Sequence, residues 1–272
     1  MKERDTPLQV PRGAILDPSR AARALRLRIH PPLPALQPWV HHHWFIDWDV
    51  SEPYTQSVLG RPCGNVVVDD GRWMLSGPSR HRFDRRVEGR GMVYGTQFRP
   101  ASTRGFLPGP ARAWVDERFD VAPRWQIDAA ALDRALRSLP DDEARVALLS
   151  EVLLDQSPVH PPDMDEANRI VELLEGRPDL TRTDQLAHAV GRTVRSLQRL
   201  LSAWVGLSPK QLVRRFRLQE ASARLTEGES IDLAGLAYSL GYADQAHFSR
   251  DFKRVVGLPP SRYAARQAGL GE

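Results

Sequence analysis

The spacing of apolar residues changes once along the chain, near residue 127. From Trp39 to about Phe119, apolar and polar residues tend to alternate, as they do in strands that bury one face. From Ile127 onward, apolar residues recur every three or four positions, which is the spacing of one helix face. The pattern therefore predicts a β-rich first part and an all-helical second part.

The β-rich part contains several short strand candidates. Trp39–Val50 places Trp44, Ile46 and Trp48 on one face. His81–Val87 and Met92–Phe98 are two further candidates, separated by glycines. Short strands at this spacing are typical of a small antiparallel barrel or sandwich.

A tight hairpin is expected at Asp70-Gly71. This dipeptide lies between Asn65–Asp69 and the apolar run that starts at Trp73. Asp and Gly both tolerate the positive φ that two-residue hairpin turns require.

Two helices are expected over Ile127–Gln156, separated by Pro140. They either pack on the β-rich part or form a dimerisation surface, and we favour packing.

Pro158, Pro161 and Pro162 follow the second of these helices and predict an extended linker. The fold class is thus α+β with two domains: an N-terminal arm (1–30, with a short basic helix candidate at its end), a β-rich domain (31–157, helical pair 127–156), a linker (158–163) and an all-α domain (164–268).

The helical domain contains an internal repeat. Three residues of the first copy recur in the second, Leu186, Ala187 and Gly191 as Leu236, Ala237 and Gly241. Each copy reads as a short helix, a glycine turn, a capped second helix and a glycine stop, which outlines a helix-turn-helix. Between the copies, Ser208-Pro209-Lys210-Gln211 is typical of a helix start, and the helix it opens would be a rigid spacer.

The second helix of each copy has one apolar and one polar face. Thr193 and Asp244 are the expected N-caps. Val194, Leu197, Leu200, Leu201 and Trp204 form the inward stripe of the first copy, and Phe248, Phe252, Val255 and Val256 that of the second. Long donors on the opposite faces suit base edges and phosphates in a major groove, although an ordinary solvated helix face would look the same.

Charge favours a nucleic-acid partner. Residues 192–266 hold 13 Lys and Arg against 6 Asp and Glu, whereas the whole chain has a net charge of only +4. A basic module is the usual electrostatic footprint of a phosphate backbone, and an evenly solvated basic surface is the alternative.

Other features limit the remaining classes. Cys63 alone forms neither an intrachain disulfide nor a thiolate zinc site. No apolar run approaches the ~20 residues of a membrane span, and the N-terminus lacks a signal-peptide core, so we expect a cytoplasmic protein without membrane partners.

The segments GLSPKQLVRRFRLQEA and IDLAGLAYSLGYADQAHFSRDFKRVVGLPPSRY resemble the signature of the AraC family of bacterial transcription regulators. The resemblance covers roughly residues 164–267. It implies a non-enzymatic transcription activator that binds double-stranded DNA with the second helix of each unit, in successive major-groove segments about 34 Å apart. It also implies contact with RNA polymerase and no cofactor.

By register, the resemblance assigns base-facing roles to six residues, Arg195, Gln198, Arg199, Gln245, His247 and Arg250. Ala246 stands where the family often has a polar residue, and Leu201 where it usually has an aromatic one. The second unit is therefore expected to contribute more backbone positioning than base reading.

The N-terminal half is similar to an uncharacterised β-rich domain that precedes this module in some AraC-type regulators. PPLPALQPWV, VVVDDG and VYGTQFRPA carry this similarity. It implies a domain that senses a small-molecule effector or mediates homodimerisation, on fold analogy alone.

Two enzymatic alternatives were weighed. His41, His43 and Asp47 have nearly the spacing of a cupin metal set, which would make the β-rich domain a metal-dependent enzyme or metal sensor, but the surrounding motif is absent. Alkyl-transfer DNA repair needs a Cys nucleophile on a four-thiolate zinc site, which Cys63 cannot supply.

Overall fold

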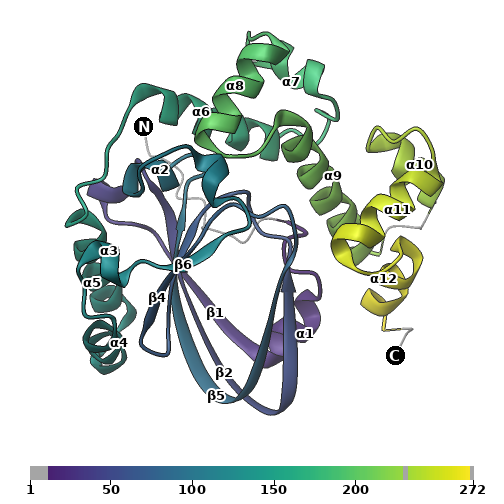
Figure 1. The fold of residues 1–272 in the computed structure, drawn as a ribbon. Coiled ribbons are helices and arrows are strands. Elements are labelled where there is room, and N and C mark those ends of the chain that lie inside the picture. The colour runs from purple at the N-terminus through teal and green to yellow at the C-terminus, as the bar shows by residue number, and fades with distance from the viewer. Residues whose placement is uncertain (1–11, 229–231, 270–272) are drawn as a thin grey trace, which may run out of the picture.

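The computed structural model describes residues 12–228 and 232–269. Within them, an antiparallel sheet with covering helices is followed by a helical module, so the predicted α+β class with two parts is confirmed (Figure 1). Residues 1–11 of the predicted arm, and Ile231 near the start of the second repeat, lie outside the described residues.

Six antiparallel strands form one sheet in the order β1-β2-β5-β3-β4-β6. Their bounds are β1 Leu25–His30, β2 Val40–Val58, β3 Asn65–Asp69, β4 Arg72–Ser76, β5 Phe83–Phe98 and β6 Arg118–Asp120. β1 and β6 are the two edges, so the sheet stays open and does not close into the barrel that was one of the expected forms.

The strand β5 is continuous where the sequence predicts two strands broken by glycines. Gly91 pairs with Trp48 and Gly95 pairs with Trp44 on β2. A Cβ at Gly91 would lie 2.3 Å from the Trp48 ring, and one at Gly95 would lie 2.1 Å from the Trp44 ring. These glycines admit indole rings onto the sheet and do not break the strand.

The sequence places residues 25–30 in an N-terminal arm, whereas in the structure they form β1 and pair with β2 along their whole length. The helix α1 (Pro18–Ala24), capped by Asp17, accounts for the first part of the expected basic helix. Alternation in Leu25–Ile29 gives the strand a half-buried face, and this outweighs the helical tendency of the basic run. Residues 25–30 of the predicted arm are therefore part of the sheet.

The predicted hairpin at Asp70-Gly71 is confirmed. Asp69 pairs with Arg72 across the turn, and Asp70 and Gly71 have φ values of 48° and 70°. The Gly71 amide donates to the Asp133 carboxylate at 3.0 Å, which attaches the turn to the helix α4 (Ala129–Ser138).

The helical pair α4 and α5 (Asp142–Leu154) packs on the sheet. Leu136 and Leu149 are buried in the same core as Phe45, Trp73 and Tyr94 from the strands. This burial supports the packing role that we favoured for the pair. Short helical segments complete this part: η1 Pro34–Leu36, α2 Thr103–Phe106, η2 Ala111–Trp114 and α3 Ala122–Trp125.

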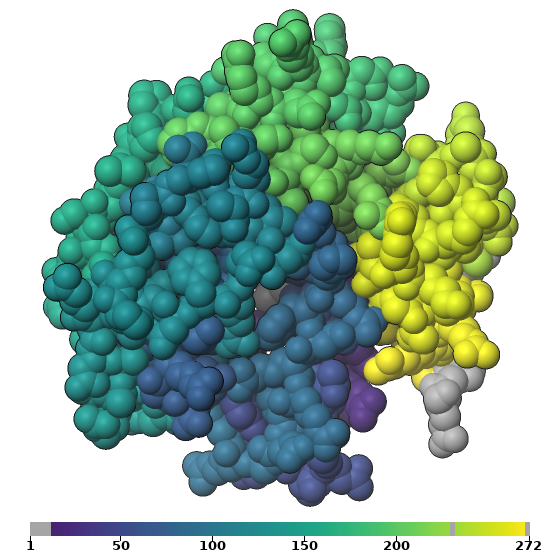
Figure 2. All heavy atoms as spheres, viewed as in Figure 1, coloured from purple at the N-terminus to yellow at the C-terminus, as the bar shows by residue number. Residues whose placement is uncertain are grey.

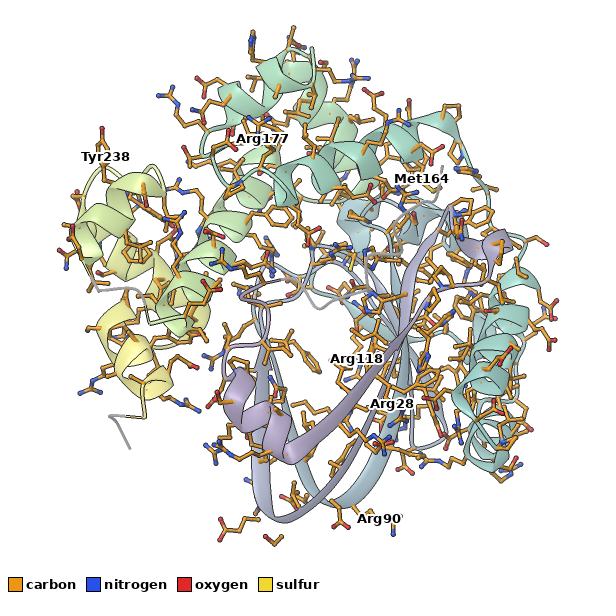
Figure 3. All side chains as sticks on the ribbon, turned by 180° about the vertical axis from the view of Figure 1, so that it is seen from behind. Arg28, Arg90, Arg118, Met164, Arg177 and Tyr238 are labelled. Atoms are coloured by element: carbon orange, nitrogen blue, oxygen red, sulfur yellow. The ribbon has the colours of Figure 1, made fainter. Side chains whose placement is uncertain are left out.

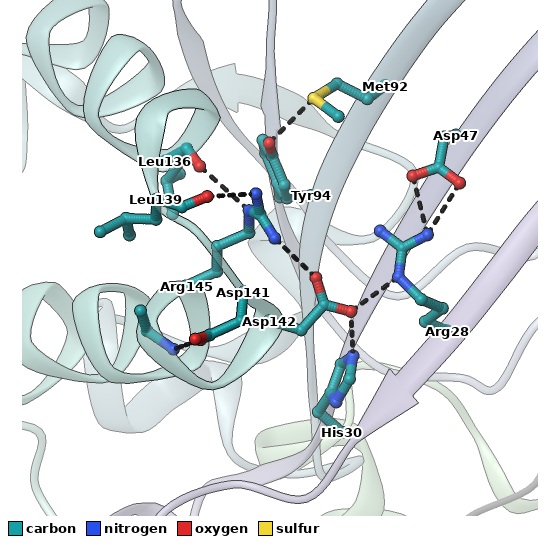
Figure 4. A network of polar contacts seen from close by, with 11 residues as sticks. Arg28, His30, Asp47, Met92, Tyr94, Leu136, Leu139, Asp141, Asp142 and Arg145 are labelled. Atoms are coloured by element: carbon teal, nitrogen blue, oxygen red, sulfur yellow. Dashed lines mark hydrogen bonds and ion pairs between the residues drawn. The ribbon is translucent and has the colours of Figure 1, made fainter.

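A polar network joins the edge strand β1 to α5 (Figure 4). The Asp142 carboxylate accepts from Arg28 Nε at 2.6 Å and from Arg145 Nη1 at 2.8 Å, and it contacts His30 Nε2 at 3.0 Å. Burial alone would raise the pKa of Asp142, but the hydrogen bonds from Arg28 and Arg145 outweigh it and lower that pKa. Asp142 is therefore ionised at neutral pH and forms ion pairs with Arg28 and Arg145.

Seven helices form the C-terminal module: α6 Pro162–Glu175, α7 Thr183–Ala189, α8 Val194–Trp204, α9 Pro209–Thr226, α10 Leu233–Ser239, α11 Gln245–Val256 and α12 Pro260–Gln267. They surround two separate cores. The helix α9 belongs to both, because Leu212 and Phe216 enter the first core while Leu218 and Leu225 enter the second.

Replacing Leu149 by Ala should lower the free energy of unfolding by about 2–5 kcal/mol, because it opens a cavity in the core shared by α5 and the sheet. Urea denaturation measures this, and the exposed Glu151→Ala on the same helix is the matched control. Unchanged stability together with a change in sedimentation would show that α5 serves an interface between chains.

Stability should fall as the pH drops below 6.5. Burial lowers the pKa of His41 and His42 to about 3, from an ordinary value of 6.5. Between these values the unfolded chain takes up protons that the folded chain excludes, so the free energy of unfolding decreases. Urea titrations at several pH values should show a shallower slope for His41→Gln, whereas His81→Gln, whose side chain is 76% exposed, should leave the slope unchanged.

Candidate DNA-binding interface

The helix α8 is positioned by its cap and its buried face. Thr193 Oγ1 accepts from the Ser196 amide at 3.1 Å, as the sequence predicts for an N-cap. The turn before it uses Gly191 at a φ of 64°. Leu197, Leu200 and Leu201 are buried, which fixes the opposite face outward.

Val194 departs from the predicted inward stripe, because it is 44% exposed. It occupies the first helical position, where the chain has just left the turn and the side chain does not reach the core. Trp204, at the other end of the stripe, is half-buried and lies 4.0 Å below the guanidinium of Arg104.

The structure exposes all three predicted reading residues of the first unit. Arg195, Gln198 and Arg199 are exposed. Within residues 12–228 and 232–269, none of the three side chains has a hydrogen-bonding or ionic partner. Their donors are therefore available to an external ligand.

The helix α11 repeats this construction. The Asp244 carboxylate accepts from the His247 amide at 2.6 Å, which confirms the second predicted cap. Its charge also suits the positive end of the helix dipole. Phe248 and Phe252 are buried and Val255 is half-buried.

The predicted reading residues of the second unit are exposed as well. Gln245, His247 and Arg250 all reach solvent, and Ala246 lies between them. The His247 ring meets the Tyr242 ring edge-on at 5.3 Å, so its position is constrained. Arg250 has no ionic partner in the described part of the chain.

Several cations elsewhere in the module are neutralised by carboxylates. Arg192 pairs with Glu166 and Arg224 pairs with Glu220, at 2.5 and 2.7 Å, and Arg177 (Figure 3) pairs with Asp179 at 2.6 Å. By contrast, Arg195, Arg199 and Arg250 have no ionic partner among the described residues and lie exposed on the two capped helices. These helices therefore present unpaired positive charge to an external ligand.

The helix α9 holds the two units apart. Ser208 and Gln211 form the predicted capping box at its start. Its 18 residues span roughly 27 Å at the usual rise, which is comparable to one turn of DNA. The first unit lies at the beginning of α9 and the second at its end (Figure 1).

Sequence reasoning missed the polar hub at Asp251. This residue is 5% exposed on the inward side of α11. It accepts from Arg214 Nε at 2.8 Å, from the Tyr242 hydroxyl at 3.0 Å and from Arg254. The signal was a carboxylate within an otherwise apolar stripe, between Phe248 and Phe252.

It also missed the contacts between α9 and the sheet domain. Arg215 is buried and donates to the carbonyl of Gly60 at 2.8 Å, and Gln219 donates to the carbonyl of Leu59 at 2.5 Å. Figure 2 shows the C-terminal helices lying against the sheet domain. These contacts leave the capped starts of α8 and α11 exposed.

The histidines considered for a cupin site do not converge. A register shift at His41 brings its ring against that of His42, with the two Nδ1 atoms 2.6 Å apart, while His43 contacts Thr96 instead. In the described residues, no group of three or more His, Cys, Asp or Glu side chains is placed to hold a metal ion. Cys63 is buried, which raises the pKa of its thiol to about 12 and makes it a core residue.

None of the described helices is both long enough and apolar enough to cross a membrane.

Two family models match the chain. Residues 186–266 match a helix-turn-helix domain, and residues 28–120 match a domain of unknown function (DUF6597). These matches coincide with the helical repeat and with most of the sheet.

Two similar proteins carry the description of putative AraC-like transcription regulators. A putative AraC-like transcription regulator of Streptomyces lividans is 39% identical over 75 residues, which cover 28% of this chain and 24% of that protein. The chain thus spans about a quarter of the length of the first relatives it matches. The transcriptional activator RhaS of Pectobacterium carotovorum is 25% identical over 88% of this chain and 92% of its own length.

Solved structures that are similar to this chain include ToxT from Vibrio cholerae. It is 16% identical to this chain, with a TM-score of 0.42, and the comparison covers 100% of both chains. The helical module is an AraC-type DNA-binding domain. In this chain the module is preceded by the part that matches the domain of unknown function, residues 28–120.

Proposed function

We propose that this protein is a sequence-specific transcription regulator that reads one DNA site with two helices. The observation that carries the proposal is the pair of capped helices, α8 and α11, with exposed and unpaired arginines at equivalent positions of the repeat, Arg199 and Arg250. Several other arginines of the module are neutralised by carboxylates, so these two are kept available for an external partner.

The base-reading set of this proposal consists of Arg195, Gln198, Arg199, Gln245, His247 and Arg250. Arginine donates two parallel hydrogen bonds to guanine, and glutamine can pair with adenine in the same groove. The caps fix the starts of both helices, and helix starts are what enter the major groove in helix-turn-helix proteins.

The second part of the proposal concerns the sheet domain. We propose that residues 31–157, together with β1, sense a small molecule or mediate dimerisation, and that the helical domain begins near α6. RNA polymerase contact and a cytoplasmic location belong to the same proposal. The direct contacts from the sheet domain to α9 support it, because they give that domain a physical route to the DNA-binding units.

Replacing Arg199 by Ala should weaken binding to the preferred DNA site by ~1–3 kcal/mol and relax selectivity at one base pair, because a bidentate contact is lost. The site is first selected from random DNA, and affinities are then measured by fluorescence anisotropy. Arg177→Ala, which removes an exposed arginine paired with Asp179, is the control. Full affinity and selectivity in Arg199→Ala would reject the assignment.

Damage to the first unit should change sequence preference more than damage to the second. Arg195 and Gln198 accompany Arg199 on α8, whereas α11 has Ala246 in its exposed face. Repeating the selection with Arg199→Ala and with Arg250→Ala measures the change in the preferred sequence. The prediction fails if Arg250→Ala alters the preferred bases more, while a uniform loss of affinity in that variant indicates backbone contact.

A further inference from the structure

A small cavity of about 60 Å³ lies where the sheet domain meets α9 and the end of α11. Its lining combines three arginines and a glutamine with apolar side chains: Arg80, Arg214, Arg215 and Gln211, with Leu59, Leu207, Leu218 and Val255. The space is large enough for a ligand of a few heavy atoms and far too small for a nucleotide.

Arg215 brings a buried positive charge to this cavity without a negative partner. It is 6% exposed and donates only to backbone carbonyls, those of Gly60 at 2.8 Å, His81 at 3.2 Å and Ser79. No carboxylate of the described residues forms an ion pair with it. Burial lowers the pKa of Arg215 to about 10, so the side chain is still charged at neutral pH. A buried cation of this kind is stabilised by a nearby anion.

Arg214 contributes an unused donor. Its Nε bonds to both oxygens of Asp251, at 3.0 and 2.8 Å, while its Nη2 is buried and has no hydrogen-bond partner. A buried donor without an acceptor is destabilising, and an acceptor placed beside it would remove this cost.

Positive charge exceeds negative charge around the cavity. Arg80 pairs with Asp116 at 2.6 Å, and Asp251 is shared between Arg214 and Arg254. The lining itself includes three guanidinium groups, those of Arg80, Arg214 and Arg215, whereas Asp116 and Asp251 are not part of it. The field at the cavity attracts an anion, and planar guanidinium groups suit the oxygens of carboxylate or phosphate.

We propose that this cavity binds a small oxyanion, either a carboxylate or inorganic phosphate, between the sheet domain and the second helix-turn-helix unit. The anion would accept from Arg214 Nη2 and lie against the charge of Arg215, with Leu59 and Val255 along its sides. The role of this cavity as the effector site of a transcription regulator rests on the proposed function, whereas anion binding by the cavity does not.

The position of the cavity gives the anion a regulatory effect. Leu59 and Arg80 belong to the sheet domain, Arg214 and Arg215 to α9, and Val255 to the reading helix α11. A ligand that contacts all three favours the arrangement in which they are docked. Binding therefore stabilises the docked position of α11.

Isothermal titration calorimetry on the full-length protein tests this, with sodium acetate and sodium phosphate at constant ionic strength. We expect saturable binding of one of them, and the anion that saturates identifies the source as carboxylate or phosphate. Arg214→Lys, which keeps a cation beside Asp251 but removes Nη2, should weaken binding about tenfold or more, and a factor of ten corresponds to ~1.4 kcal/mol.

Arg254→Gln is the matched control, because Arg254 bonds to the same Asp251 without lining the cavity. It should bind the anion as the wild type does, and thermal unfolding checks that both variants are folded. Arg80→Gln is a second test variant. Because the Arg80 side chain is 53% exposed, this substitution should leave folding intact, and it should also weaken anion binding. Two results would overturn the proposal. The first is that neither anion shows saturable binding at concentrations up to about 10 mM, which would mean a dissociation constant above the millimolar range. The second is that Arg254→Gln weakens anion binding as much as Arg214→Lys.

DNA binding is measured separately by anisotropy, without and with the bound anion. Failure to bind any selected DNA would reject the proposed function and leave the anion site standing. Normal DNA binding without anion binding would reject the site alone. A shift in DNA affinity on adding the anion, lost in Arg214→Lys, would establish the link between the two.

Discussion

The helix α9 is the element on which the rest of this structure depends. Its first half completes the core of one helix-turn-helix unit and its second half completes the core of the other, so neither unit is whole without it. The same helix is fastened to the sheet domain through Arg215 and Gln219. The chain near Gly13 packs so closely on it that an added Cβ would lie 2.0 Å from the Gln219 carbonyl oxygen. Both helix-turn-helix units and the sheet domain are therefore held in position by contacts with one helix.

Local signals of the sequence predicted the helical module well. Caps at Thr193, Ser208 and Asp244 are short-range hydrogen bonds between residues three positions apart, so residue type alone indicates them. The repeat and the apolar spacing then define which faces turn inward. Exposure of the six reading residues follows directly from that, whereas their contacts with bases depend on a partner and stay a prediction.

Long-range features were harder to predict. Gly89 and Gly91 were taken as breaks, because a glycine in a sequence does not show that an indole ring will lie over it, as that of Trp48 does at Gly91. Residues 25–30 looked like an arm, since strand pairing depends on a neighbour that is distant in the chain. Nothing in the sequence distinguishes Arg215 from the neighbouring Arg214 and Arg217, because only the folded sheet domain supplies the carbonyls to which it donates.

Because the two cores share α9, this helix also sets the rotation of one helix-turn-helix unit relative to the other about the helix axis. Each residue of an α-helix turns the chain by about 100° and advances it by ~1.5 Å. Because Phe216 belongs to one core and Leu218 to the other, the angle between the two units is defined by the chain around a single position, Arg217. One residue added or removed there would rotate the second unit to a different side of the helix axis, so the length of α9 sets the relative orientation of the two units as well as their separation.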